Sequence, residues 1–238
     1  MRPIPILMYH NIAAAPRGVK LRGLYVSPGR FARQMQLLRR LGYQGLSMGA
    51  ALPWLRGERE GKVAVVTFDD GYVDNLEHAL PVLRGLGFSA TCFVVSGAVG
   101  SYNRWDAEQL GVRKPLMDAT GLRAWQAAGM EIGAHTRTHP HLPQLAATDL
   151  EGEIRGSRQD LEELLGLPVT QFCYPYGEAG EREMTAAQAA GYAAAVTVRR
   201  GRARPGESLW SLPRVSVGGH HAPHVFPLQI LTRHEDRH

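Results

Sequence analysis

Seven short apolar runs constrain the fold of this chain more than any other feature of its sequence. Several of them are apolar throughout rather than at every second residue, which is typical of parallel strands that are buried on both faces. We therefore expect each run to form a strand inside a parallel sheet. The runs occupy residues 4–10, 63–68, 89–95, 131–135, 169–174, 193–198 and 212–217.

Helical patterns fill the segments between these runs. Ser27 and Pro28 predict a helix start, because Ser is a favoured N-cap and Pro is favoured at the first helical position. Thr148 and Glu151 have the spacing of a capping box, which predicts a second helix start. The expected helices cover residues 28–41, 74–84, 120–128, 148–165 and 185–190.

Strands that alternate with helices predict βα units around a parallel sheet. Seven strands in 238 residues favour an irregular (β/α) barrel of about seven parallel strands, and the alternative is an open, doubly wound sheet. With 44% hydrophobic residues, the chain can bury one large core. We therefore expect residues 1–238 to form a single catalytic domain.

Composition limits the partners and the location of the chain. The net charge of +5 comes mostly from scattered arginines, and no nucleic-acid-binding motif accompanies it, so we expect a solvated surface and no nucleic-acid partner. Cys92 and Cys173 lie inside apolar runs and are expected in the core. No apolar run reaches the roughly 20 residues of a membrane span, and the N-terminus lacks a signal h-region. These features predict a cytoplasmic protein.

Polar residues recur where the predicted strands end. The carboxyl ends of the strands in a parallel barrel are where active sites are built. We therefore expect these side chains to meet at one end of the barrel. The residues are His10, Asp69, Asp70, His135, Tyr174 and Tyr176.

The sequence Asp69-Asp70-Gly71 follows the second predicted strand. Adjacent residues at a strand end point in different directions, so one carboxylate can bind a metal while the other faces the water beside it. Gly71 permits the tight turn that this requires. The alternative is a helix N-cap followed by a first-turn acid.

His135 and His139 are four residues apart. Pro140 disfavours helical geometry at His139, so a loop or short turn is expected there. Together with Asp70, the two histidines would make a three-ligand site with open positions, as in a catalytic metal centre. The alternative is a pair of surface histidines in a polar loop.

The segment 172–177 is an aromatic run that leaves a predicted strand. Pro175 fixes the chain, so the backbone N–H of Tyr176 could point into the site as an oxyanion donor. The alternative is a packed turn of aromatic residues. The irregular stretch 96–118, which contains Trp105 and Asp106, is expected to cover the mouth of the pocket.

These three segments together resemble the polysaccharide deacetylase family, also called carbohydrate esterase family four. The resemblance implies that Asp69 is the base and that Asp70, His135 and His139 hold a divalent metal, expected to be Zn²⁺. It also implies that the Tyr176 N–H binds the oxyanion. The family's third motif carries an Arg before its Pro, whereas this chain has Gln171-Phe-Cys-Tyr. Arg214 is the candidate replacement.

The N-terminal sequence Leu7-Met-Tyr-His-Asn11 is similar to the branch that contains poly-N-acetylglucosamine deacetylases. In that branch the barrel is circularly permuted and the acid histidine comes from the first strand. This resemblance implies that His10 is the general acid. Its rivals are His220, His221 and His224, late in the chain.

The resemblance implies a hydrolase that removes an N-acetyl group from an N-acetylated sugar or polysaccharide. Two alternatives stay open. One is an O-acetyl esterase or an N-deformylase that acts on a carbohydrate or a lipid-linked sugar. The more distant one is an inactive glycan-binding module, against which the intact Asp69, Asp70, His135 and His139 argue.

Overall fold

A computed structural model describes residues 1–236, and its strands all pair in parallel. All seven predicted strands are present, and the structure adds one three-residue strand, β2. The strands are β1 (Ile6–Tyr9), β2 (Gln44–Leu46), β3 (Val63–Phe68), β4 (Thr91–Val94), β5 (Glu131–Ala134), β6 (Gln171–Cys173), β7 (Ala194–Arg200) and β8 (Leu212–Ser216).

The sheet closes on itself because β1 pairs with both β8 and β3. The closed ring contains seven strands, in the order β1-β8-β7-β6-β5-β4-β3. Strand β2 pairs with the first half of β3, and β4 pairs with its second half, so β2 fills the gap at the amino end of the barrel. The predicted barrel is confirmed and the open sheet is wrong. The circular permutation stays a prediction.

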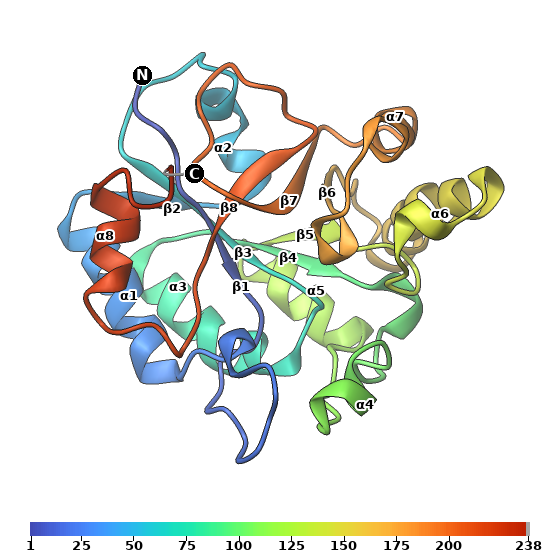
Figure 1. Ribbon diagram of the computed structural model, residues 1–238, viewed down its shortest axis with the longest axis horizontal. Coiled ribbons are helices and arrows are strands. Elements are labelled where there is room, and N and C mark those ends of the chain that lie inside the picture. Colours follow the sequence, from blue (N-terminus) through green and yellow to red (C-terminus); the bar gives the residue numbers. More distant parts are fainter. Residues whose placement is uncertain (237–238) are drawn as a thin grey trace.

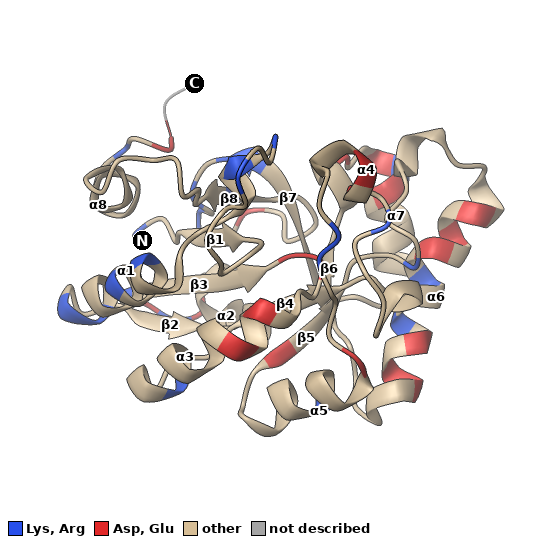
Figure 2. Cartoon of the chain, turned by 90° about the horizontal axis from the view of Figure 1, so that it is seen from below, with Lys and Arg blue, Asp and Glu red and all other residues tan. Residues whose placement is uncertain are grey.

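Helices surround the strands, with α8 beside α1 (Figure 1). Acidic residues gather on α6, and basic residues recur along α1 (Figure 2). No helix in residues 1–236 is long and apolar enough to cross a membrane. The helices are α1 (Pro28–Arg40), α2 (Met48–Leu55), α3 (Leu80–Leu86), α4 (Ala107–Leu110), α5 (Ala119–Ala127), α6 (Ala147–Leu165), α7 (Glu181–Ala189) and α8 (Val225–Leu231).

The helix starts were predicted with mixed success. Helix α1 begins after Ser27, as expected. The capping box at Thr148 is wrong, because α6 begins one residue earlier, at Ala147, and no side chain caps it. Helix α7 begins at Glu181 rather than near residue 185, since the Glu183 carboxylate accepts the N–H of Gly180 at 2.8 Å and stabilises an earlier start.

Alternate residues of each strand face two different cores. Val63 and Val65 of β3 point into the barrel, whereas Ala64 and Val66 pack against the surrounding helices. The barrel interior also contacts Met48, Ala51 and Leu55 of α2, so this helix closes the amino end. The carboxyl end is left for polar residues. Cys92 and Cys173 are buried free thiols, as predicted.

Candidate active site

The carboxyl end of the barrel brings together the residues that the sequence singled out. The turn after β3 supplies Asp69 and Asp70, and the loop after β5 supplies His135 and His139. Asp70 lies 3.7 Å from both His135 and His139, although the two histidines are more than 60 residues further along the chain. His10 directly follows β1, Arg214 lies in β8, and Tyr176 lies in the turn after β6.

Asp69 is held by Arg214. The guanidinium makes two hydrogen bonds to the carboxylate, Nη1 to Oδ1 at 2.7 Å and Nη2 to Oδ2 at 2.8 Å. Both side chains are buried. Burial alone would raise the pKa of Asp69, but the charge and hydrogen bonds of Arg214 outweigh it and hold this pKa well below its ordinary value. Asp69 is therefore kept ionised and fixed in orientation.

Arg214 is itself fixed by the barrel wall. Its Nε donates to the Thr197 carbonyl at 2.7 Å, and its Nη1 donates to the Thr67 hydroxyl at 3.2 Å. Pairing between β7 and β8 and closure of the ring through β1 place it opposite Asp69, which lies 145 positions earlier in the sequence. The structure thus supplies a bracing arginine from a strand other than the one that precedes Pro175.

Asp70 faces two imidazoles instead of a cation. Its Oδ1 lies 3.7 Å from Nε2 of His135 and 3.7 Å from Nε2 of His139. Burial, followed by the charges of Asp69 and Asp106, raises the pKa of Asp70. Burial also lowers the pKa of His135 to about 4 and lowers that of His139, so both rings are neutral at pH 7. Neutral imidazoles are the form that binds metals.

The orientation of His135 is set by the backbone. Its Nδ1 donates to the Cys173 carbonyl oxygen at 2.7 Å, which leaves Nε2 free to face Asp70. The ligand atoms of Asp70, His135 and His139 all lie within 4.8 Å of one another. Two imidazole nitrogens and one carboxylate oxygen fit a divalent metal with open coordination positions.

A second group of possible ligands, Asp69, His135 and Cys173, is equally compact. Its chemistry fits a metal less well. Asp69 already accepts two hydrogen bonds from Arg214, and burial raises the pKa of the Cys173 thiol, which keeps it protonated. The donor set that includes Asp70 is therefore the better candidate.

Backbone strain is concentrated at this end of the barrel. In residues 1–236 the non-glycine residues with positive φ are Asp70, Thr136, His139 and Tyr176, with φ between 57° and 75°. A positive φ is unfavourable for a non-glycine residue, and residues with this strained backbone cluster at functional sites. His139 precedes Pro140 and lies in a loop, as the sequence predicted.

The group of Tyr176 that is available as a hydrogen-bond donor is its backbone N–H. The N–H groups of the next two residues, Gly177 and Glu178, bond to carbonyls within the turn, but within the described part of the chain the Tyr176 N–H has no acceptor. Its φ of 57° turns the peptide away from the strand direction. The Tyr176 ring is 39% exposed, stacks on His141 and meets the edge of His139.

His10 directly follows β1 and lies beside Asp69, with its Nε2 3.8 Å from Oδ2 of that carboxylate. Burial lowers the pKa of His10, and the Asp69 charge partly opposes this effect. Among the described residues, His220, His221 and His224 make no such approach to Asp69. The geometry is compatible with the predicted acid, whose role stays a prediction.

Two contacts were only partly expected from the sequence. Trp105 stacks on the His139 ring, with ring centroids 4.8 Å apart and planes 19° apart, so the 96–118 stretch does cover the site. The Thr136 hydroxyl accepts the N–H of His139 at 3.0 Å and shapes the loop. The role of Thr136 in the loop was not predicted. Its only signal in the sequence is its place between the two histidines.

Comparison with known proteins decides the family. The sequence model described as "Polysaccharide deacetylase" matches residues 56–195. The chain belongs to the polysaccharide deacetylase family. It is 30% identical over 216 residues to YxkH of Bacillus subtilis, covering 90% of this chain and 71% of that protein, whose name refers to the same family.

Two further relatives are informative. The poly-β-1,6-N-acetyl-D-glucosamine N-deacetylase of Escherichia coli is 25% identical over 266 residues, which cover 96% of this chain but only 38% of that enzyme. The structure of the Streptococcus pyogenes deacetylase PplD in complex with acetate superposes with a TM-score of 0.80 at 25% identity, covering 96% of this chain and 98% of that one. The predicted resemblance to this family is confirmed.

Proposed function

We propose that this protein is a metal-dependent hydrolase that removes the N-acetyl group from an N-acetylated sugar chain. One observation carries the proposal. Two adjacent buried carboxylates have opposite surroundings: Asp69 is bound by Arg214, whereas Asp70 faces His135 and His139. Such a division is expected when one carboxylate is a base and the other a metal ligand. The N-deacetylase name of the E. coli relative supports the choice of acyl group.

Asp70, His135 and His139 would hold the metal, and their donor set favours Zn²⁺. When bound, a divalent metal lowers the pKa of water and polarises a carbonyl. His135 and His139 are already in the form that would bind the metal, because burial keeps both rings neutral and the Cys173 carbonyl fixes the tautomer of His135.

The remaining residues handle protons and charge. Asp69 accepts the proton of the attacking water, since Arg214 keeps it ionised and aimed. The unpaired Tyr176 N–H donates to the acyl oxygen as negative charge develops there. His10, whose Nε2 lies 3.8 Å from Asp69, donates a proton to the departing nitrogen. The products are acetate and a free amino sugar.

The test is a side-by-side assay of acyl release from N-acetylated, O-acetylated and N-formylated glycans. The protein is first stripped with a chelator and then loaded with Zn²⁺. We expect acetate from the N-acetylated glycans only after metal is added. Release from O-acetylated or N-formylated glycans alone would favour the alternative hydrolases, and no release from any of them would refute the proposal.

A further inference from the structure

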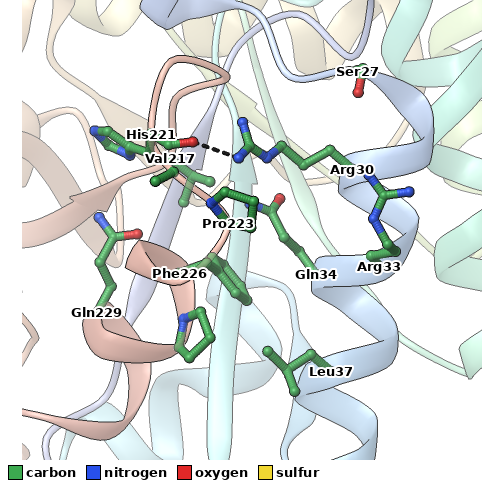
Figure 3. A pocket seen from close by; sticks show the side chains of 12 residues that line it. Ser27, Arg30, Arg33, Gln34, Leu37, Val217, His221, Pro223, Phe226 and Gln229 are labelled. Carbon is green, nitrogen blue, oxygen red and sulfur yellow. Dashed lines mark hydrogen bonds between the residues drawn. The ribbon is translucent and has the colours of Figure 1, made fainter.

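A cavity of about 460 Å³ lies between helices α1 and α8, on the outer side of the strand ring (Figure 3). The first three turns of α1, the loop after β8 and helix α8 form its walls. None of the residues of the proposed mechanism lines it. The cavity is therefore separate from the candidate active site, and its own side chains decide what it can bind.

One part of the cavity is apolar. Leu37 of α1 and Phe226 of α8 lie opposite each other there (Figure 3). Pro227 of α8 and Val217, which directly follows β8, add further apolar surface. A hydrocarbon group held between these side chains would be removed from water, which is favourable in proportion to the apolar area that is buried.

The other part of the cavity carries positive charge. Arg30 donates to the carbonyl oxygens of Gly219 and His221, as the dashed line in Figure 3 shows for His221. These carbonyl groups orient the guanidinium but leave its charge uncompensated. Arg33 extends along α1 toward the same end of the helix (Figure 3). No Asp or Glu of residues 1–236 lines the cavity, so the two arginines would attract an anion.

The start of α1 adds to this positive charge. Ser27 is the N-cap residue of α1 and lines the cavity, and its side chain makes no capping hydrogen bond. Its hydroxyl can therefore donate to a ligand. The amino end of a helix also carries a partial positive charge, which favours an anion at this position.

A buried hydrogen-bond donor faces the cavity as well. Gln34 is 7% exposed, and its Oε1 accepts the Tyr9 hydroxyl at 3.0 Å, which fixes the orientation of the amide. Its Nε2 makes no hydrogen bond within residues 1–236, yet this atom is not fully enclosed by protein. The side chain points from α1 toward Pro223 and Phe226 (Figure 3). A donor without an acceptor is costly, and a ligand oxygen in the cavity would relieve that cost.

We propose that this cavity binds a single-chain amphipathic anion from solution. Its carboxylate or phosphate head accepts hydrogen bonds from Arg30, Arg33 and Gln34, and its alkyl chain lies between Leu37 and Phe226. The arginines favour an anion over a neutral alcohol, and the apolar wall favours an alkyl chain over a small inorganic ion. The inference goes beyond the proposed function and does not depend on it.

The test measures the binding of decanoate and of decyl phosphate to the whole chain by calorimetry. No metal is added, so that the head group cannot bind at the candidate metal site. We expect one bound molecule per chain, and the tighter of the two anions identifies the head group. Affinity should rise from butyrate to decanoate by about fourfold for each methylene that is buried. Decanol, which lacks the charge, should bind roughly tenfold more weakly than decanoate.

Two variants locate the site, and each has a matched control. Arg33→Glu should weaken decanoate binding roughly tenfold or more, whereas Arg40→Glu makes the same change in net charge at an exposed position of α1 outside the cavity and should have little effect. Ala222→Trp places a large ring at an exposed position of the cavity wall and should also weaken binding. Leu231→Trp, at an exposed position of α8 that does not line the cavity, is its control.

Several results would overturn the assignment. Absence of binding of both decanoate and decyl phosphate to the wild type would refute it. Equal losses in Arg33→Glu and Arg40→Glu would show general attraction of anions to a basic protein. An affinity that does not rise from butyrate to decanoate would show that the apolar wall is not used. Binding to phosphatidylglycerol vesicles without binding of free decanoate would assign this face to a membrane surface instead.

Discussion

The two ends of the barrel differ in what their buried polar groups contact, although in residues 1–236 each end has an unpaired side-chain atom, Gln171 Oε1 at the amino end and His139 Nδ1 at the carboxyl end. At the amino end, the Glu131 carboxylate accepts hydrogen bonds from the Gly49 N–H, at the start of α2, and from the Thr91 hydroxyl. At the carboxyl end, His139 Nδ1 and the Tyr176 N–H have no partner among the described residues. The residues with strained backbone also lie at this end.

From this difference we assign stability to the amino end and the proposed chemistry to the carboxyl end. Glu131 is placed as a carboxylate at a helix N-terminus should be, and it fastens α2 across the bottom of the barrel. The carboxyl end contains the unpaired Tyr176 N–H and the residues with positive φ. Their strained backbone persists because the surrounding strands hold it in place. A substitution at one end should therefore change stability, and a substitution at the other should change chemistry.

The largest effect is expected at the base. Asp69→Asn should lower kcat by about 10²–10⁴-fold, because an amide cannot accept the proton of water, while metal affinity is retained. Asp70→Asn should instead weaken metal binding. Metal content and kcat measured on both variants test this division, and equal metal content in the two would contradict it.

A smaller loss is expected at His10. His10→Ala should bind metal normally and lose on the order of a hundredfold in kcat, since the leaving nitrogen is no longer protonated. The fall in kcat/KM at alkaline pH should disappear, because that fall reports loss of the His10 proton. If a change at His220, His221 or His224 has this effect instead, the acid lies in the C-terminal segment.

The bracing arginine predicts a shift in pH dependence. Without Arg214, burial would raise the pKa of Asp69, and the base would become protonated at a higher pH. The acidic limb of the kcat/KM profile of Arg214→Met should therefore move to higher pH. Arg214→Lys, which keeps a cation, should shift it less and serves as the control if Arg214→Met does not fold. An unmoved limb in a folded Arg214→Met would show that Asp69 does not depend on this pair.

The smallest effect on catalysis is expected at the amino end. Glu131→Ala removes the acceptor for Gly49 and Thr91, which should lower the free energy of unfolding by about 1–3 kcal/mol. Denaturant unfolding measures this loss. The kcat of the folded fraction and its metal content should equal those of the wild type. A large loss of kcat would show that the two ends are not independent.

Much of this arrangement follows from local sequence. The strands are continuous apolar runs, and His10, Asp69, Asp70 and His135 each come where a run ends, so the closed sheet had to bring them together. Strand β2 and helix α2 were missed for physical reasons. The strand is three residues long and contains Gly45, which fits closely against Phe88, and Pro53 interrupts the helical pattern of α2.

Other features depend on tertiary closure. The pairing of Arg214 with Asp69 requires β8 to lie beside β1, which no local pattern encodes, although the missing Arg before Pro175 pointed to a replacement. The stacking of Trp105 on His139 and the left-handed backbone at Thr136 depend on loops whose shape is set by contacts distant in sequence.

The central claim is that the strained, open end of the barrel is a metal site built from Asp70, His135 and His139. Zn²⁺ titration of chelator-treated protein, followed by calorimetry and elemental analysis, tests it most directly. We predict one tightly bound Zn²⁺ per chain in the wild type, in Asp69→Asn and in His10→Ala, and loss of tight binding in His135→Ala and His139→Ala. Wild type without stoichiometric Zn²⁺, or unchanged binding in both histidine variants, would contradict the account.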